Sequence, residues 1–140
     1  LKPLGQVASG GELSRIMLAI KSVLADTDDI PTLIFDEIDT GISGRTAQKV
    51  AEKLSRIGRA HQVLCITHLA QIAAMADRHF RIEKSVVRGK TVTAVQPLDE
   101  EASIEELARL TGGAQMTDTA YQHAREMKEL AARTKIKRDF

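Results

Sequence analysis

The chain has 140 residues, of which 43% are hydrophobic and 28% charged, and its formal net charge is +1. This composition is typical of one globular domain and excludes a disordered chain, while the balanced charge gives no argument for or against a nucleic-acid partner. A single cysteine, Cys65, excludes an internal disulfide and fits a reducing compartment, and no apolar run approaches the length of a membrane span.

The first predicted element is an amphipathic helix over residues 12–25. Its apolar residues recur at helical spacing and form one stripe: Leu13, Ile16, Met17, Ile20 and Leu24. Ser9 and Glu12 have the S-x-x-E spacing of a capping box, which starts a helix. Gly10 and Gly11 lie between them, although each glycine in a helix costs roughly 1 kcal/mol relative to alanine. The glycine pair suggests that a bulky group approaches the backbone, and bare N–H groups at a helix N-terminus attract phosphate.

A short strand is predicted next, after a polar break at residues 26–31. Residues 32–35 are apolar without alternation, which is typical of a strand buried on both faces. A loop follows, and it opens with the adjacent carboxylates Asp36 and Glu37. Ligands bind at this end of the strands in open α/β sheets, so one carboxylate can face a metal while the other faces an attacking water. With Asp39 these groups crowd three negative charges together, which predicts a counter-charge such as Mg²⁺.

A second helix is predicted over residues 45–57, with Gly58 as its C-terminal cap. The apolar stripe of this helix consists of Ala47, Val50, Ala51, Leu54 and Ile57. Residues 63–67 predict another buried strand that ends at His68, and a short helix is expected over residues 69–76. A lone histidine is usually a structural or surface residue, but His68 would reach the sheet edge that carries the carboxylates.

The last part of the chain predicts a hairpin or small meander followed by two helices. Residues 80–95 alternate in polarity around a turn at Arg88-Gly89-Lys90. Helices are expected over residues 103–110 and 117–133, and Ser103 with Glu106 forms a second S-x-x-E spacing. Because strands alternate with helices, we expect an α/β fold with parallel central strands flanked by helices.

Three motifs occur in the order found in ATP-binding-cassette ATPases, and the chain resembles that family from about residue 5 to 130. ASGGE at residues 8–12 is similar to the signature motif, and residues 33–37 resemble the Walker B motif. Asp39 falls at the D-loop position and His68 at the switch-histidine position. Transporters usually carry glutamine where this chain has Glu12, whereas the SMC-like branch of chromosome-maintenance and DNA-repair ATPases carries glutamate. FDEIDTGISGRTA, ITHLAQIAAMAD and IEELARLTGG are most similar to a bacterial DNA-repair member of that branch.

The resemblance implies a P-loop NTPase fold of the ABC/SMC type, with ATP and Mg²⁺ as cofactors. It also implies a cytoplasmic, nucleoid-associated protein that acts in DNA double-strand break repair and recombination. On the catalytic side, Asp36 would hold Mg²⁺, Glu37 would orient or deprotonate the attacking water, and His68 would contact the γ-phosphate.

The signature motif is implied to act on a nucleotide that another molecule holds. Ser9 and Gly11, in one motif with Gly10 and Glu12, would bind the γ-phosphate of ATP on a second head. Asp39 would then lie at the interface between the two heads. This implication agrees with the anion affinity of a bare helix N-terminus.

The phosphate-binding loop G-x-x-x-x-G-K-[ST] does not occur in this sequence. Gly89-Lys90-Thr91 lacks the required first glycine, because that position holds Lys84, and it lies in a strand-to-strand turn. In the SMC-like family the loop belongs to an N-terminal half, so residues 1–140 resemble a single domain, the C-terminal lobe of a split head. The implied partners are that N-terminal half, a second head and DNA, and we predict that the chain alone does not hydrolyse ATP.

Three alternatives remain open at this point. Asp39-Thr40-Gly41 matches the D-T-G of aspartic proteases, which need two carboxylates sharing one proton and an all-β fold. A nucleotide-gated dimerisation module would keep the fold without catalysis. The head of a transporter ATPase, or of another SMC-type protein, would keep both the fold and the catalysis.

Overall fold

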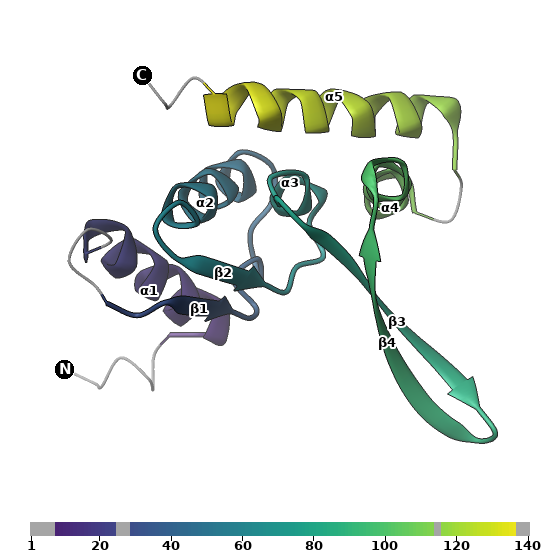
Figure 1. Cartoon of the computed structure of the whole chain (residues 1–140), viewed down its shortest axis with the longest axis horizontal. Helices are drawn as coiled ribbons and strands as arrows, with labels where there is room; N and C mark the ends of the chain where they lie inside the picture. The colour runs from purple at the N-terminus through teal and green to yellow at the C-terminus, as the bar shows by residue number, and fades with distance from the viewer. Residues whose placement is uncertain (1–7, 25–28, 114–115, 137–140) are drawn as a thin grey trace. The chain divides into compact units, whose positions relative to one another are not determined.

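The computed structural model describes residues 8–24, 29–113 and 116–136 (Figure 1). Packing divides the chain into two compact units, Leu1–Met75 and Ala76–Phe140, called here the N-terminal and the C-terminal unit. A single domain over residues 1–140 stays a prediction, since two such units can belong to one domain. Part of the predicted polar break, residues 26–28, lies outside the described residues.

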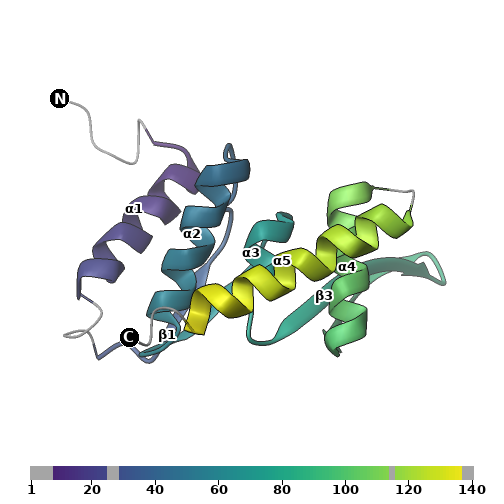
Figure 2. The same cartoon turned by 90° about the horizontal axis from the view of Figure 1, so that it is seen from above.

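The N-terminal unit is a parallel strand pair with helices packed around it. Its elements are α1 (Gly10–Leu24), β1 (Thr32–Phe35), α2 (Gly44–Ile57), β2 (Gln62–Cys65) and α3 (Ala70–Ala74). β1 and β2 pair in parallel, with Thr32 opposite Gln62 and Phe35 opposite Cys65. α2 packs on α3 and also lies beside α1 (Figures 1 and 2). The predicted parallel strands with flanking helices are therefore confirmed.

The stripe on α2 forms much of the core of this unit. All five predicted stripe residues are buried: Ala47, Val50, Ala51, Leu54 and Ile57. Gly58 ends the helix as predicted, and its N–H donates to the Leu54 carbonyl oxygen at 2.9 Å. The period of 3.6 residues thus identified both the helix and its buried face.

The predicted burial of β1 on both faces is wrong, and the apolar stripe of α1 is exposed as well. The apolar stripe of α1 is not core, because its members keep between 36% and 49% of their surface exposed: Leu13, Ile16, Met17, Ile20 and Leu24. The buried residues of α1 are Gly11 and Leu18, the latter at 4% exposure. β1 is not buried on both faces either, since Leu33 and Phe35 are covered whereas Ile34 is 69% exposed. In a two-stranded sheet that carries helices on one face, alternate side chains of each strand stay uncovered.

The same arrangement exposes part of β2. Leu64 is 46% exposed and Ile66, just after the strand, is 51% exposed. Ile34, Leu64 and Ile66 together form the bare apolar face of the N-terminal unit. Parallel sheets are normally covered on both faces, so this face is unusual.

The C-terminal unit begins with the predicted hairpin. β3 (His79–Val87) and β4 (Lys90–Leu98) are antiparallel, from His79 opposite Leu98 to Val87 opposite Lys90 (Figure 1). Arg88 and Gly89 form the turn with φ values of 51° and 73°. Two consecutive residues with positive φ are the signature of a type I′ turn, whose twist suits a hairpin. The hairpin prediction is confirmed.

Two helices complete this unit, α4 (Glu100–Gly112) and α5 (Asp118–Ile136), and they pack on one another. The second capping box is a wrong prediction. α4 starts earlier, because Asp99 is its cap and accepts a hydrogen bond from the Ala102 N–H at 2.8 Å. Ser103 lies inside the helix, where it is buried and 2.8 Å from Nδ1 of His79.

None of the helices in the described part of the chain is long and apolar enough to cross a lipid bilayer.

Candidate functional site

The first turn of α1 has the predicted capping box. The Glu12 N–H donates to Oγ of Ser9 at 3.3 Å, and the Ser9 N–H donates to Oε2 of Glu12 at 2.8 Å. The Ser9 hydroxyl also donates to that carboxylate oxygen at 3.1 Å. The backbone N–H of Ser9, and then its hydroxyl, hold the pKa of Glu12 below its usual value. The capping box is therefore confirmed, with Glu12 in its ionised form.

The two glycines of this turn lie against the loop that follows β1. A Cβ atom on Gly11 would lie 2.8 Å from the Glu37 carbonyl oxygen and 3.0 Å from Cβ of Thr40. A Cβ atom on Gly10 would lie 2.6 Å from Oε2 of Glu37. The bulky group that approaches this backbone is thus a loop of the same chain. The glycine pair is explained without an outside phosphate, and a phosphate-binding role for this helix end stays a prediction.

The loop after β1 presents both adjacent carboxylates on an exposed turn. Asp36 and Glu37 are exposed, and the Glu37 N–H donates to Oδ1 of Asp36 at 2.9 Å. Glu37 has a φ of 57°, in the left-handed region that non-glycine residues rarely occupy. Such a backbone costs about 1–3 kcal/mol and is concentrated at functional sites. The Thr40 N–H closes the turn by donating to the Glu37 carbonyl oxygen at 3.0 Å.

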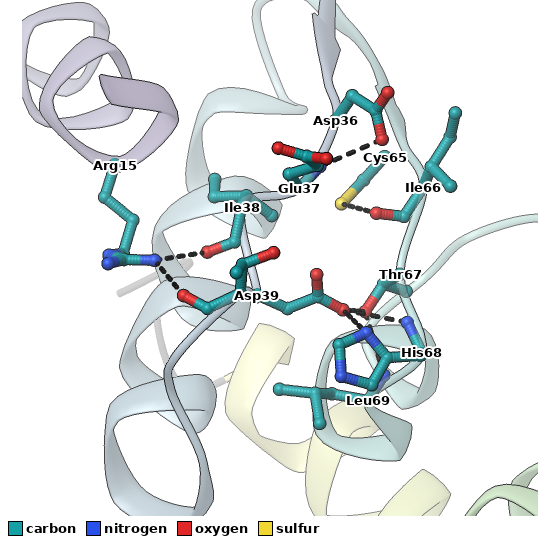
Figure 3. A network of polar contacts seen from close by, with 11 residues as sticks. Arg15, Asp36, Glu37, Ile38, Asp39, Cys65, Ile66, Thr67, His68 and Leu69 are labelled. Atoms are coloured by element: carbon teal, nitrogen blue, oxygen red, sulfur yellow. Dashed lines mark hydrogen bonds and ion pairs between the residues drawn. The ribbon is translucent and has the colours of Figure 1, made fainter. Parts of the chain in front are cut away.

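Two residues of α1 hold this loop and were not predicted from the sequence. Oγ of Ser14 donates to the Asp36 carbonyl oxygen at 2.8 Å. Nη1 of Arg15 donates to the carbonyl oxygens of Ile38 and Thr40, at 3.1 and 2.8 Å (Figure 3). Ser14 and Arg15 follow Gly11 by three and four positions, so they share its face of the helix. Polar residues at those positions, beside a glycine, were the signal that could have found them.

Asp39 joins this loop to the end of β2. Its carboxylate is 3% exposed, and Oδ2 accepts from Oγ1 of Thr67 at 2.6 Å and from the His68 N–H at 2.8 Å. The same oxygen lies 2.9 Å from Nδ1 of His68 (Figure 3). Burial opposes ionisation of Asp39, but the bonds from Thr67 and His68 outweigh it and hold its pKa below the usual 3.8. Thr67 was not assigned a role from the sequence.

The predicted site residues fall into two groups on one sheet edge. The first surrounds the start of α1 and consists of Ser9, Gly10, Gly11, Glu12, Asp36 and Glu37. The second is the pair of Asp39 and His68. Because β1 and β2 run parallel and end together, His68 does reach the edge that carries the carboxylates, as predicted. A role for Asp39 at a dimer interface stays a prediction, and the burial of its carboxylate directs attention to a role inside the chain.

A bound Mg²⁺ would need oxygen donors at this edge. Within the described residues there is no group of three or more His, Cys, Asp or Glu side chains that could hold a metal. Mg²⁺ does not need such a group, since it keeps several waters and usually binds one or two carboxylates together with phosphate oxygens. The exposed carboxylate of Asp36 fits that mode of binding.

Cys65 is the remaining reactive side chain near this edge. Its burial, and then the negative charges of Asp39 and Asp36, raise the pKa of Cys65 to about 12. A thiol with so high a pKa stays protonated at neutral pH and is a poor nucleophile. Cys65 is therefore not a candidate nucleophile of this site.

The fold defines the class of protein. A solved structure from a study of ATP-driven dimerization and DNA-stimulated activation of SMC ATPases matches 75% of this chain and 63% of its own chain. The TM-score is 0.53 and the sequence identity is 26%. The predicted α/β fold of an ABC/SMC-type P-loop NTPase is confirmed. It differs from the all-β fold that the aspartic-protease alternative requires, and Asp39 of the D-T-G is already bonded to Thr67 and His68.

The particular relatives are DNA-repair proteins. The chain is 50% identical to the DNA repair protein RecN of Bacillus subtilis over 135 residues, which are 96% of this chain and 23% of that protein. RecN of Deinococcus radiodurans is 50% identical over 91% of this chain, and RecN of Vibrio cholerae is 48% identical over 91%. The chain spans less than a quarter of the length of these relatives. No family model matches it. Its resemblance to the SMC-like DNA-repair branch is confirmed by these relatives.

Proposed function

We propose that this chain is the C-terminal part of a RecN-like ATPase of the SMC-like branch, acting in DNA double-strand break repair and recombination. The observation that carries the proposal is 50% identity to RecN over 96% of the chain. The strand ends add support, because β1 and β2 bring Asp36, Glu37 and His68 to one edge. Whole-protein activity belongs to this proposal, since the chain covers only part of its relatives.

Each residue of that edge has a proposed role in ATP hydrolysis. Bound ATP and Mg²⁺ would supply the transferable phosphoryl group and neutralise its charge. Asp36 holds the metal through a carboxylate oxygen or through water. Glu37 orients or deprotonates the attacking water from its exposed position beside α1, and His68 contacts the γ-phosphate with its exposed imidazole.

The start of α1 is proposed to complete the site of a second head. Ser9 lies at an exposed helix N-terminus, but its N–H and hydroxyl donate to the Glu12 carboxylate and the Glu12 N–H donates to Ser9. A phosphate would therefore replace the Glu12 carboxylate as the acceptor at this cap. A helix end of this kind favours a γ-phosphate. The partner at this helix end is therefore a second head. The similarity to the DNA repair protein RecN adds DNA as a partner and the cytoplasm, at the nucleoid, as the place of action.

A third partner is the N-terminal half of the full-length ATPase, which is not part of these 140 residues and would hold the phosphate-binding loop. The motif G-x-x-x-x-G-K-[ST] does not occur in this sequence, so the chain alone is proposed to be inactive. The bare apolar face and the exposed stripe of α1 support a protein partner for the N-terminal unit, because large exposed apolar surfaces mark interaction sites.

The test is to assemble the chain with the N-terminal half and measure ATP turnover. Glu37→Gln should lower kcat by about 100-fold or more, the usual contribution of a general base, while ATP-dependent pairing of the heads persists. Glu105→Gln is the matched control, an exposed glutamate on α4 whose loss should leave turnover unchanged.

Three outcomes would contradict this proposal. Robust turnover by the chain alone would exclude the need for an N-terminal half. Turnover that survives Glu37→Gln would show that Glu37 is not the base. Head pairing in an assembly that never hydrolyses ATP would instead support a nucleotide-gated dimerisation module.

A further inference from the structure

The expected role of Asp39 at an interface between heads does not explain why its carboxylate contacts His68 of the same chain. Both residues lie in the loops that follow neighbouring parallel strands, and the buried carboxylate of Asp39 contacts the exposed imidazole of His68. We propose that Asp39 is a positioning residue for His68, which holds Nδ1 of the imidazole as a hydrogen-bond donor and turns Nε2 to the ligand. This inference rests on the proposed function, since it assigns His68 to the nucleotide.

The geometry limits what His68 can do. Oδ2 of Asp39 has three neighbours from the β2 end: Oγ1 of Thr67 at 2.6 Å, the His68 N–H at 2.8 Å and Nδ1 of His68 at 2.9 Å (Figure 3). The Thr67 hydroxyl in turn accepts from the Leu69 N–H at 3.0 Å. The Asp39 carboxylate that contacts the imidazole therefore also holds the backbone of His68 and, through the Thr67 hydroxyl, that of Leu69. The side chain of His68 is nevertheless 70% exposed, so its other nitrogen is accessible.

The charge state of Asp39 fixes the direction of the hydrogen bond. An ionised carboxylate has only acceptors, so Nδ1 must carry the hydrogen. In a neutral imidazole with hydrogen on Nδ1, the other nitrogen Nε2 has a free lone pair and can only accept. A bond from Nε2 to a phosphate oxygen then requires the imidazolium, for which Asp39 is the counter-charge. The pair thus sets which partner His68 can bind in each protonation state.

A purely structural role for Asp39 predicts something different. The bonds from Thr67 and from the His68 N–H would suffice to fasten the loop to β2, and the amide oxygen of asparagine can accept both. Asp39→Asn keeps the shape and those two bonds but removes the charge that selects the tautomer. The tautomer of His68 therefore distinguishes a role of Asp39 in positioning the imidazole from a role in holding the loop against β2.

The first experiment needs only this chain, labelled with ¹⁵N. Long-range ¹⁵N–¹H correlation spectra of the imidazole at pH 8 should show the hydrogen of His68 on Nδ1. Asp39→Asn should move the majority of the hydrogen to Nε2, the form that free imidazole side chains favour. His68→Gln identifies the signal, and Asp29→Asn is the control, an exposed acid outside this pair that should leave the tautomer unchanged.

These outcomes do not depend on ATP. A majority of hydrogen on Nε2 in the unaltered chain overturns the inference, even if Asp39→Asn fails to fold. An unchanged tautomer in a folded Asp39→Asn chain also overturns it. If the assembled protein has no ATPase activity while the Nδ1 tautomer is present, the proposed function fails and the geometry of the pair stands.

A second measurement links the pair to turnover. In the assembled ATPase, Asp39→Asn should lower kcat at least tenfold with little change in KM for ATP, because the variant lacks the negative charge that stabilises the His68 imidazolium beside the transferred phosphate. In the His68→Gln background, Asp39→Asn should have no further effect, since residues that act through one another are not additive. Additive losses would mean that Asp39 acts elsewhere.

Discussion

At the scale of single residues, the two glycines at the start of α1 differ in what surrounds them. Gly11 lies against backbone, since a Cβ atom there would lie 2.8 Å from the Glu37 carbonyl oxygen. Gly10 faces the flexible end of the Glu37 side chain, and its Cβ atom would lie 2.6 Å from Oε2. A methyl group at Gly10 can therefore be accommodated by moving the Glu37 side chain, whereas one at Gly11 must move the loop.

We predict that Gly11→Ala lowers the free energy of unfolding by about 1–3 kcal/mol, the usual cost of overpacking, despite the better helix propensity of alanine. Urea unfolding followed by circular dichroism measures this. Gly58→Ala is the control, since Gly58 has an ordinary helical φ of −60° and a Cβ there would lie 3.4 Å from the Leu54 carbonyl oxygen. If both variants unfold at the same urea concentration, the close packing of Gly11 is wrong.

Contacts between residues close in sequence could be predicted, whereas contacts between different elements could not. The capping box could be found because Ser9 and Glu12 are three positions apart. The partner of the glycine pair could not, since Glu37 lies on another element and only the folded chain brings it close. Asp39 was assigned from its place in a motif, and its bonds to Thr67 and His68 depend on the pairing of β1 with β2.

At the scale of elements, the hairpin turn has a residue poorly suited to its backbone. Arg88 has a φ of 51°, and arginine gains nothing from the left-handed region, whereas Asn-Gly is the preferred pair in type I′ turns. We predict that Arg88→Asn stabilises the chain by about 0.5–1 kcal/mol, a rise of a few degrees in Tm. Calorimetry measures it, with Arg88→Ala as the control that should give no rise. Equal Tm values for the two variants would contradict the turn type.

The elements themselves were predictable where local pattern decides them. Gly89 between alternating residues identified the hairpin, and the stripe from Ala47 to Ile57 identified both α2 and its buried face. The stripe of α1 identified a helix but not its environment, because periodicity says which face is apolar and not what covers it. For the same reason the apolar run of β1 could not reveal that Ile34 would be exposed.

At the scale of the whole molecule, three groups with lowered pKa values make stability fall as the solution becomes acidic. Burial, and then the charge of Lys128, lower the pKa of His79 from 6.5, although Glu106 opposes this. The hydrogen bond from Arg109 lowers the pKa of Glu106 from 4.5, and that of Asp39 is also lowered, from 3.8. In each case the unfolded chain binds protons more readily than the folded chain, so acid favours unfolding.

We predict that the free energy of unfolding changes little between pH 7 and pH 8 and falls below about pH 6.5 as the unfolded chain protonates at His79. The slope for one proton cannot exceed about 1.4 kcal/mol per pH unit. A second loss follows below pH 4.5, when carboxylates protonate. Urea titrations at several pH values measure both. His79→Gln should remove the first loss and keep the second, and a first loss that persists in this variant would mean another group causes it.

The parallel register of β1 and β2 also has a consequence for the order in which the chain folds. Thr32 and Gln62 are 30 positions apart, so this pairing must close a long loop before it gains any contact. The hairpin closes over two residues, and such hairpins form within about 1–10 μs. We therefore expect β3 and β4 to form early and the edge that carries Asp36, Glu37 and His68 to form late. During synthesis or refolding, the candidate functional site would therefore form after the hairpin.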